Sequence, residues 1–282
     1  MNVGIVGLGL IGGSFARAVS ALTPHTVLGR DIRRDVLAKA KLLDAVELEL
    51  TDERLPACDL VLLALYPAAA VSFVRKRADL FKPGAVVLDV CGVKRSVCGE
   101  LFPLAAEKGF TFVGAHPMAG IERSGFDHAT KTLFRGASMV LVPPKNVPMA
   151  LLAEIKHFFA ALGFAQFAVA TPEGHDRIIA YTSQLPHVVS SAFIESPTAA
   201  DHTGFSAGSY KDMTRVARLD ETMWTELFLD NRDNLLRELR TLQGNLALFE
   251  RALDAADAEG LRALLKRGKE RKIEADRADL TE

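Results

Sequence analysis

Short apolar runs recur through the first 170 residues and alternate with segments in which apolar residues follow helical spacing. Some runs, such as residues 60–65, are apolar throughout, which is typical of strands buried on both faces of a sheet. The predicted strands are residues 3–6, 26–29, 60–65, 85–90, 110–113, 137–142 and 166–169. Their alternation with helical segments predicts a doubly wound, parallel α/β sheet.

The pattern changes at Thr171, after which helical spacing dominates. Thr171 can cap a helix that has Pro172 in its first turn, and Pro186 should kink or interrupt the helical segment. Leucines between residues 235 and 246 also follow helical spacing, which suits either a dimer interface or packing within the chain. We therefore predict an α/β domain over residues 1–170 and an all-α domain over residues 171–282.

Charge and composition exclude several classes of protein. The net charge is −1 with acidic and basic residues interspersed, so no basic surface favours nucleic acid or an anionic membrane as a partner. The chain enters its first strand without a basic segment and a following apolar stretch, and its longest charge-free runs contain polar residues. We therefore expect a cytoplasmic protein without a membrane span. Cys58, Cys91 and Cys98 have no metal-ligand spacing and are expected to be reduced and buried, with no metal site.

Three glycines follow the first strand directly. Gly7, Gly9 and Gly12 form the dinucleotide-binding fingerprint in its required context of strand, turn and helix. Such glycines let the backbone approach a pyrophosphate, whose charge is stabilised by the helix N-terminus, where Leu10 and Ile11 lie. The first domain is therefore predicted to be a Rossmann-like domain that binds NAD or NADP.

The residues at the end of the second strand bear on the choice of cofactor. Asp31 can accept hydrogen bonds from ribose hydroxyls and would repel a 2′-phosphate, which favours NAD. Arg30, Arg33 and Arg34 keep NADP open, because they could bind that phosphate if Asp31 turned away. A solvated cluster that opens the next helix is the other explanation for these arginines.

Two further residues end strands at the same edge of the predicted sheet as the glycine turn. Leu65 closes the apolar run of residues 60–65 and is expected to contact the cofactor. Lys94 follows the strand of residues 85–90. It is either a solvated residue at a helix start or a cation that faces cofactor or substrate.

His116 is the candidate catalytic residue. It follows the apolar run of residues 110–113, and Pro117 holds it extended by disfavouring the α region for the preceding residue. We expect it just beyond the carboxyl end of that strand, where ligands bind in open α/β sheets and where a proton-transfer group is useful. The alternative is that His116 only completes a turn.

Several of these residues belong to motifs that occur in a fixed order along the chain. The motifs are Gly7-x-Gly9-x-x-Gly12, Asp89-Val90-x-x-Val93-Lys94, Gly114-x-His116-Pro117-Met118-Ala119-Gly120, Ser183-x-Leu185-Pro186-His187 and Lys211-Asp212-x-Thr214-Arg215. Through them the chain, from residue 3 to about residue 224, resembles the prephenate/arogenate dehydrogenase family of tyrosine biosynthesis.

The resemblance implies the oxidative decarboxylation of a cyclohexadienol. The ring carbon that bears the hydroxyl gives hydride to NAD, and the ring carboxylate leaves as CO₂. Prephenate would yield 4-hydroxyphenylpyruvate, and arogenate, the alternative substrate, would yield tyrosine. By this resemblance His116 accepts the hydroxyl proton, Arg215 binds a substrate carboxylate, and His187 contacts the substrate from the second domain.

The resemblance also implies further substrate-binding residues. Lys211 lies in the same motif as Arg215. Glu122 and Asp176 are expected to form an ionic network with Arg215 that gates the site. Trp224 matches an aromatic residue near the substrate pocket, although a buried core tryptophan would explain it equally simply.

One position departs from the family pattern. Family members commonly carry a serine, whose hydroxyl assists the catalytic histidine, where this chain has Gly92. Either water or another side chain then orients His116, or the substrate hydroxyl is held differently.

The expected partners are a small-molecule substrate and a second copy of the chain, joined through the helical domain. We expect neither a chorismate mutase segment before Met1 nor a regulatory domain after the helices, so any inhibition by tyrosine would act at the active site. Two other functions compete with this one. The first is a two-domain dehydrogenase of the β-hydroxyacid type, and the second is a non-catalytic NAD-binding sensor.

Overall fold

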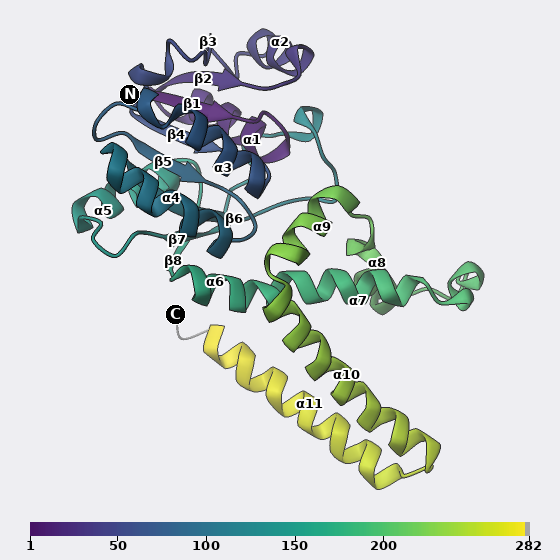
Figure 1. The fold of residues 1–282 in the computed structure, drawn as a ribbon. Coiled ribbons are helices and arrows are strands. Elements are labelled where there is room, and N and C mark those ends of the chain that lie inside the picture. The colour runs from purple at the N-terminus through teal and green to yellow at the C-terminus, as the bar shows by residue number, and fades with distance from the viewer. Residues whose placement is uncertain (280–282) are drawn as a thin grey trace. The chain divides into compact units, whose positions relative to one another are not determined.

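The computed structural model describes residues 1–279 and separates into two compact units. The first runs from Met1 to Arg232 and contains the sheet, its covering helices and a series of further helices (Figure 1). The second begins at Asp233 and consists of a helical hairpin.

The first unit is built on one eight-stranded sheet with the order β3-β2-β1-β4-β5-β6-β7-β8. Its strands are β1 (Asn2–Val6), β2 (Thr26–Arg30), β3 (Leu48–Glu49), β4 (Leu60–Leu63), β5 (Val86–Asp89), β6 (Thr111–Met118), β7 (Ser138–Val142) and β8 (Gln166–Val169). Every predicted strand is present. The short edge strand β3 was not predicted, because it has two exposed residues and no apolar run.

The prediction of a wholly parallel sheet is wrong at one pair of strands. β6 and β7 are antiparallel, whereas all other neighbouring strands are parallel. A parallel pair needs a long crossover, usually a helix, to bring the chain back to the starting edge. Residues 119–137 contain only a short 3-10 helix, Phe126–His128, so the chain returns directly and the strand direction reverses.

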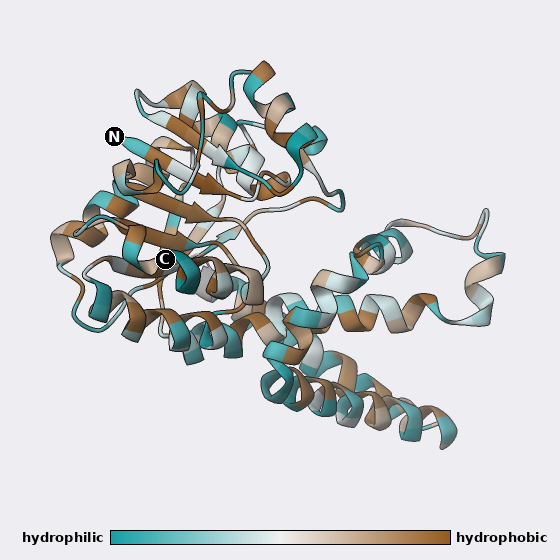
Figure 2. Cartoon of the chain, turned by 45° about the horizontal axis from the view of Figure 1, so that its top comes forward, coloured by the Kyte–Doolittle hydropathy of each residue, from teal (hydrophilic) through white to brown (hydrophobic). Residues whose placement is uncertain are grey.

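Helices cover both faces of the sheet. They are α1 (Leu10–Leu22), α2 (Arg34–Leu42), α3 (Pro67–Arg77), α4 (Arg95–Lys108) and α5 (Met149–Ala161). Adjacent residues of one strand point to opposite faces. Accordingly, Leu62 packs in a core with α1, α2 and α5, while Val61 packs in a second core with α3 and α4. Figure 2 shows the apolar strands between these amphipathic helices, and the doubly wound α/β prediction is confirmed.

Helices follow β8 to the end of the first unit. They are α6 (Pro172–Ile179), a π-helical turn (Ala180–Gln184), α7 (Leu185–Ile194), α8 (Gly208–Thr214) and α9 (Glu221–Asp230), with two short 3-10 helices, Pro197–Asp201 and Arg215–Ala217. Thr171 caps α6 as predicted, because its hydroxyl accepts a hydrogen bond of 3.0 Å from the backbone N–H of Gly174. The predicted interruption at Pro186 is also confirmed, since the π-helical turn ends directly before α7. A proline removes one helical N–H, which favours such an irregularity.

The change from sheet to helices falls at the predicted domain boundary near residue 170, but the compact units divide at residue 232. The reason is that α6 packs on α4 and belongs to the first unit. The division at residues 170/171 into a cofactor-binding domain and a helical, substrate-binding domain therefore stays a prediction.

The second unit is a hairpin of α10 (Arg232–Asp254) and α11 (Ala258–Asp279). Asp257 caps α11, because its carboxylate accepts a hydrogen bond of 2.9 Å from the backbone N–H of Gly260. Several large apolar side chains on the hairpin are exposed, including Leu246, Leu253 and Leu265. Among the described helices, none has the length and apolar content that crossing a bilayer requires.

Candidate active site

The glycine turn between β1 and α1 has the backbone geometry that the fingerprint requires. Gly7 has a φ of +85°, which disfavours other residues. A Cβ on Gly12 would lie 1.8 Å from the carbonyl oxygen of Gly7, so only glycine fits there. A Cβ on Gly9 would meet no protein atom within 4 Å. The turn is therefore closed on the protein side and open at Gly9, as a cradle for a pyrophosphate should be.

The first turn of α1 supplies the donors of this cradle. Leu10 and Ile11 are its first residues, and both are partly exposed. The first N–H groups of a helix have no partner within the helix, and the helix dipole makes this end positive. The N-terminus of α1 can therefore bind an anionic group that approaches over Gly9.

Asp31, at the end of β2, is bound to the same turn. Its carboxylate accepts hydrogen bonds from the backbone N–H of Leu8 at 2.7 Å and from that of Arg33 at 2.8 Å. A carboxylate has about four lone-pair positions, so Asp31 can still accept from a ribose hydroxyl.

The arginine next to it is occupied within the protein. Arg30 forms an ion pair with Asp52, which also accepts from Nε of Arg77 at 2.7 Å. The guanidinium groups of Arg30 and Arg77 both lie over the ring of Phe73, at 5.6 and 4.6 Å from its centroid. Because these contacts engage the guanidinium of Arg30, it is not free to bind a 2′-phosphate.

Leu65 lies two residues beyond the end of β4 and packs against the glycine turn. One of its methyl groups is 3.0 Å from the position of a Cβ on Gly7, and its backbone carbonyl accepts from Sγ of Cys91 at 3.3 Å. The structure therefore brings Leu65 together with the fingerprint.

Neither of the roles predicted for Lys94 is correct. The side chain is fully buried, and its ammonium donates to the carboxylate of Asp89, to the carbonyl of Cys91 at 2.8 Å and to that of Val93 at 3.1 Å. An ammonium has three N–H groups, and here the protein binds all three. Lys94 neutralises the buried Asp89 at the end of β5, and its ammonium therefore does not face a cofactor.

His116 lies within β6, opposite Val140 of β7, and not in a loop beyond the strand as predicted. The strand continues because Pro117 keeps His116 extended and because β7 pairs with this part of the chain. The apolar run ends at Gly114 in the sequence, so the apolar pattern did not predict that the strand continues through His116.

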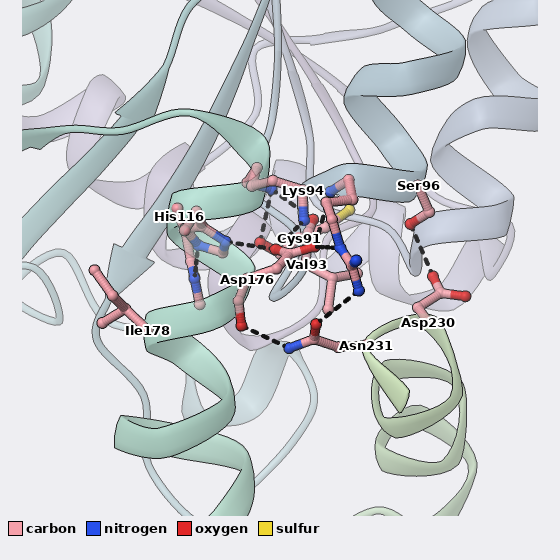
Figure 3. A network of polar contacts seen from close by, with 12 residues as sticks. Cys91, Val93, Lys94, Ser96, His116, Asp176, Ile178, Asp230 and Asn231 are labelled. Carbon is pink, nitrogen blue, oxygen red and sulfur yellow. Dashed lines mark hydrogen bonds and ion pairs between the residues drawn. The ribbon is translucent and has the colours of Figure 1, made fainter. Parts of the chain in front are cut away.

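The ring of His116 is hydrogen-bonded to a second histidine. Its Nδ1 lies 2.9 Å from Nε2 of His175 in α6, and Nδ1 of His175 lies 2.7 Å from the carboxylate of Asp176. Asp176 is fully buried and also accepts from the backbone N–H groups of Lys94 at 2.7 Å and Arg95 at 2.9 Å, which begin α4 (Figure 3). A chain of polar contacts thus runs from the candidate base to a helix N-terminus.

The surroundings shift the pKa of each member of this chain. Burial lowers the pKa of His116 well below the usual histidine value, and the charges of His175 and Lys94 lower it further. Burial also lowers the pKa of His175, although its hydrogen bond to Asp176 opposes the shift. Burial alone would raise the pKa of Asp176, but hydrogen bonds from His175 and Arg95 outweigh it and lower the value. At neutral pH both rings are therefore neutral and Asp176 is ionised.

Buried amides attach this chain of contacts to α9. Nδ2 of Asn231 donates to the backbone carbonyl of Asp176 at 2.7 Å and to Oε1 of Gln184 at 2.8 Å, and Gln184 donates to the carbonyl of Leu227 at 3.0 Å. Leu227 also lies against Gly92, where a Cβ would be 3.3 Å from two of its methyl carbons. The position of the family serine is therefore packed by Leu227, and the side chain that contacts His116 is His175.

The predicted ionic network is only partly correct. Arg215 forms an ion pair with Glu122, but Asp176 takes no part in this pair, because its carboxylate is bound to His175 and to the start of α4. Both members of the pair are exposed at the surface.

His187 and Trp224 lie close to this ion pair. Their rings are stacked with centroids 3.8 Å apart, and Nδ1 of His187 donates to the carbonyl of Ser183 at 2.8 Å, which leaves Nε2 available. Burial lowers the pKa of His187. The charge of Arg215 lowers it further, whereas the charge of Glu122 raises it. Trp224 is partly exposed and not a buried core residue. Lys211 is exposed on α8, one turn before Arg215.

Sequence analysis missed the role of His175. The residue was visible beside Asp176 in a predicted helix, but nothing in the sequence indicates that a side chain 59 positions away faces His116.

Comparison with known proteins identifies the family of the chain. Residues 15–167 match the family model described as the nucleotide-binding domain of prephenate dehydrogenase, and residues 171–267 match its dimerization domain. The chain belongs to the prephenate dehydrogenase family. It is therefore an enzyme, a dehydrogenase of aromatic amino acid biosynthesis, and the sensor and β-hydroxyacid alternatives are set aside.

Several relatives resemble the chain along its whole length. It is 31% identical to a cyclohexadienyl dehydrogenase of Zymomonas mobilis over 92% of this chain and 91% of the relative. The crystal structure of Aquifex aeolicus prephenate dehydrogenase with hydroxyphenyl propionate and NAD+ has a TM-score of 0.84 and 28% identity, and the match covers 98% of both chains. The Synechocystis arogenate dehydrogenase has a TM-score of 0.82 and 25% identity, with 98% of this chain and 100% of that one covered.

Proposed function

We propose that the chain converts prephenate to 4-hydroxyphenylpyruvate and CO₂ with NAD+ as the hydride acceptor. The observation that carries the proposal is the hydrogen bond between His116 and His175, whose other ring nitrogen is bound to Asp176. It leaves Nε2 of His116 as the ring atom available to a substrate. Among the relatives, the Aquifex aeolicus enzyme was crystallised with NAD+ and a hydroxyphenyl ligand.

The residues of the glycine turn fit NAD. Gly9 gives open access to the N-terminus of α1, and Asp31 lies at the end of β2 with lone pairs free for a ribose. NAD supplies the site with a two-electron hydride acceptor. Arg30 is held by Asp52, which supports NAD over NADP, since no free guanidinium of this residue awaits a 2′-phosphate.

His116 moves one proton in the proposed reaction. As hydride leaves the carbinol carbon of the substrate, Nε2 of His116 takes the proton of the hydroxyl, and that carbon becomes a carbonyl carbon. The ring carboxylate then leaves as CO₂, and the electrons of the broken bond make the ring aromatic and give a phenolate, which regains the proton. A base that is neutral at the working pH suits this transfer, and the lowered pKa of His116 keeps it neutral.

Arg215 and its neighbours are proposed to bind the other end of the substrate. A guanidinium forms two parallel hydrogen bonds with a carboxylate, which fixes orientation as well as charge. The substrate would replace Glu122 as the partner of Arg215, while His187 offers Nε2 and Trp224 offers a ring face beside it. Lys211, one turn away, adds a second cation, which suits a dicarboxylate such as prephenate.

Arogenate is the alternative substrate. It carries an ammonium where prephenate has a keto group, and Glu122 beside Arg215 is a carboxylate that could receive this ammonium. Tyrosine shares the ammonium and carboxylate and is proposed to compete at the same position.

The helical part of the chain is proposed to form a homodimer. The match of residues 171–267 to a dimerization domain and the exposed leucines of α10 and α11 support this assembly. We propose a cytoplasmic location, which suits three free, buried cysteines.

A steady-state assay tests the proposal. Purified protein is given prephenate or arogenate, each with NAD or NADP, and reduced nicotinamide is followed by absorbance. The expected result is turnover with prephenate and NAD. Turnover with arogenate alone would establish the alternative, and inactivity of folded, NAD-binding protein with all four pairs would overturn both.

A further inference from the structure

The direction of the hydrogen bonds from Asp176 to His116 follows from the protonation states. Asp176 is ionised, because three hydrogen bonds reach its buried carboxylate from His175, Lys94 and Arg95. An ionised carboxylate only accepts hydrogen bonds. The proton between the two residues therefore belongs to Nδ1 of His175.

The next bond is determined in the same way. His175 is neutral at pH 7 and has one ring proton, which Nδ1 carries. Its Nε2 can then only accept, so Nδ1 of His116 must be the donor across the 2.9 Å contact. A neutral His116 with its proton on Nδ1 has a lone pair on Nε2.

We propose that His175 and Asp176 are positioning residues that hold His116 in the tautomer with an unprotonated Nε2. This inference rests on the proposed function, in which Nε2 is the atom that accepts the substrate proton. The two residues do not touch the substrate in this account. They act through the ring of His116, and the same bonds remain when that ring becomes an imidazolium, because its Nδ1–H still donates to His175.

The elements around the chain of contacts contribute three further charges. The guanidinium of Arg95, in α4, forms an ion pair with Asp176 at 3.4 Å, which favours the ionised carboxylate. Lys94, at the start of α4, disfavours protonation of both histidines, and Asp89 at the end of β5 favours protonation of His175. Asp89 and Lys94 form a buried ion pair, so their effects largely offset each other. The ion pair with Arg95 keeps Asp176 an acceptor, so it supports the same tautomer that the hydrogen bonds of His175 set.

A matched pair of variants at position 175 separates hydrogen bonding from shape. Glutamine and methionine have similar length and volume, but glutamine offers the Nδ1–H of His116 an amide oxygen, whereas the thioether sulfur of methionine is only a weak acceptor. We expect His175→Met to lower kcat about 100-fold, the lower end of what positioned proton transfer contributes. His175→Gln should recover most of this loss, and KM values for substrate and NAD should stay within about threefold in both variants. Equal kcat values for the two variants would overturn the proposal.

A second readout does not need turnover. Protein with ¹⁵N-labelled histidine gives separate nitrogen shifts for protonated and unprotonated ring positions, and His116→Asn identifies the signals of His116. We expect a protonated Nδ1 and a bare Nε2 in the native chain and in His175→Gln, and a mixture of tautomers in His175→Met. A mixture in the native chain would refute the positioning role. The expected tautomer in a protein inactive with both substrates would refute the proposed function alone.

Discussion

His116 in β6 and His175 in α6 are joined by a 2.9 Å contact between Nδ1 and Nε2, although 59 residues separate them in the chain. Asp176 makes the contact possible, because its carboxylate binds the first N–H groups of α4 and so holds α6 beside the sheet. Asp176 therefore attaches α6 to the start of α4 and also binds His175, the residue that contacts the candidate base.

Two glycine substitutions test the cradle proposed for NAD. Gly12→Ala places a methyl group 1.8 Å from the carbonyl of Gly7, so the free protein should lose about 2 kcal/mol or more of unfolding free energy. Gly9→Ala meets no protein atom within 4 Å, so the free energy of unfolding should change by less than about 0.5 kcal/mol. Its methyl group nevertheless projects where the pyrophosphate would lie, and binding of NAD should weaken. Urea unfolding and NAD titration check both, and full NAD affinity in Gly9→Ala would contradict the proposed placement.

Arg215→Ala tests the carboxylate site. Hydrogen bonds to a charged group contribute about 1.5–3 kcal/mol, so KM for the substrate should rise about 10- to 100-fold. In the proposed arrangement Arg215 binds the end of the substrate away from the reacting carbon, so kcat should change much less. The matching variant Glu122→Gln keeps the shape of the partner but removes its charge, and it should not raise KM for prephenate. An unchanged KM in Arg215→Ala would remove this residue from the binding site.

The buried histidines predict how stability depends on pH. Burial holds the pKa values of His116, His175 and His187 below the usual value. In the unfolded chain these rings gain protons as the pH falls through about 6.5. In the folded chain their lowered pKa values keep them neutral to a lower pH. The unfolded state then binds more protons, so the free energy of unfolding should decrease as the pH falls below about 6.5. Urea midpoints should be similar at pH 7 and 8 and lower at pH 5, and a midpoint at pH 5 equal to that at pH 7 would disagree with these shifts.

Much of the fold could be predicted from the sequence, because local patterns determine it. Continuous apolar runs identify buried strands, and the glycine turn identifies where a dinucleotide is expected. The antiparallel direction of β7 was not predictable in this way, because it depends on whether the segment between β6 and β7 forms a crossover helix. Residues 119–137 carry no apolar periodicity that would reveal the missing crossover helix.

The site was less predictable, because its residues meet through tertiary contacts. A lysine is usually solvated, so the burial of Lys94 could be predicted only by knowing that Asp89 is buried beside it. The resemblance alone predicts that Asp176 belongs to the ionic network of Arg215. In the structure its carboxylate is instead hydrogen-bonded to His175. Motif order located His116, His187 and Arg215, but it could not indicate which side chain orients His116.

The most direct test of the central claim is the effect of His116→Asn on steady-state kinetics with prephenate and NAD. Asparagine preserves size and polarity but cannot accept a proton, so kcat should fall about 10²- to 10⁴-fold while KM stays nearly constant. His157→Asn, at an exposed position of α5, is the control and should match the native chain. A native kcat in His116→Asn would contradict the assignment of His116 as the base.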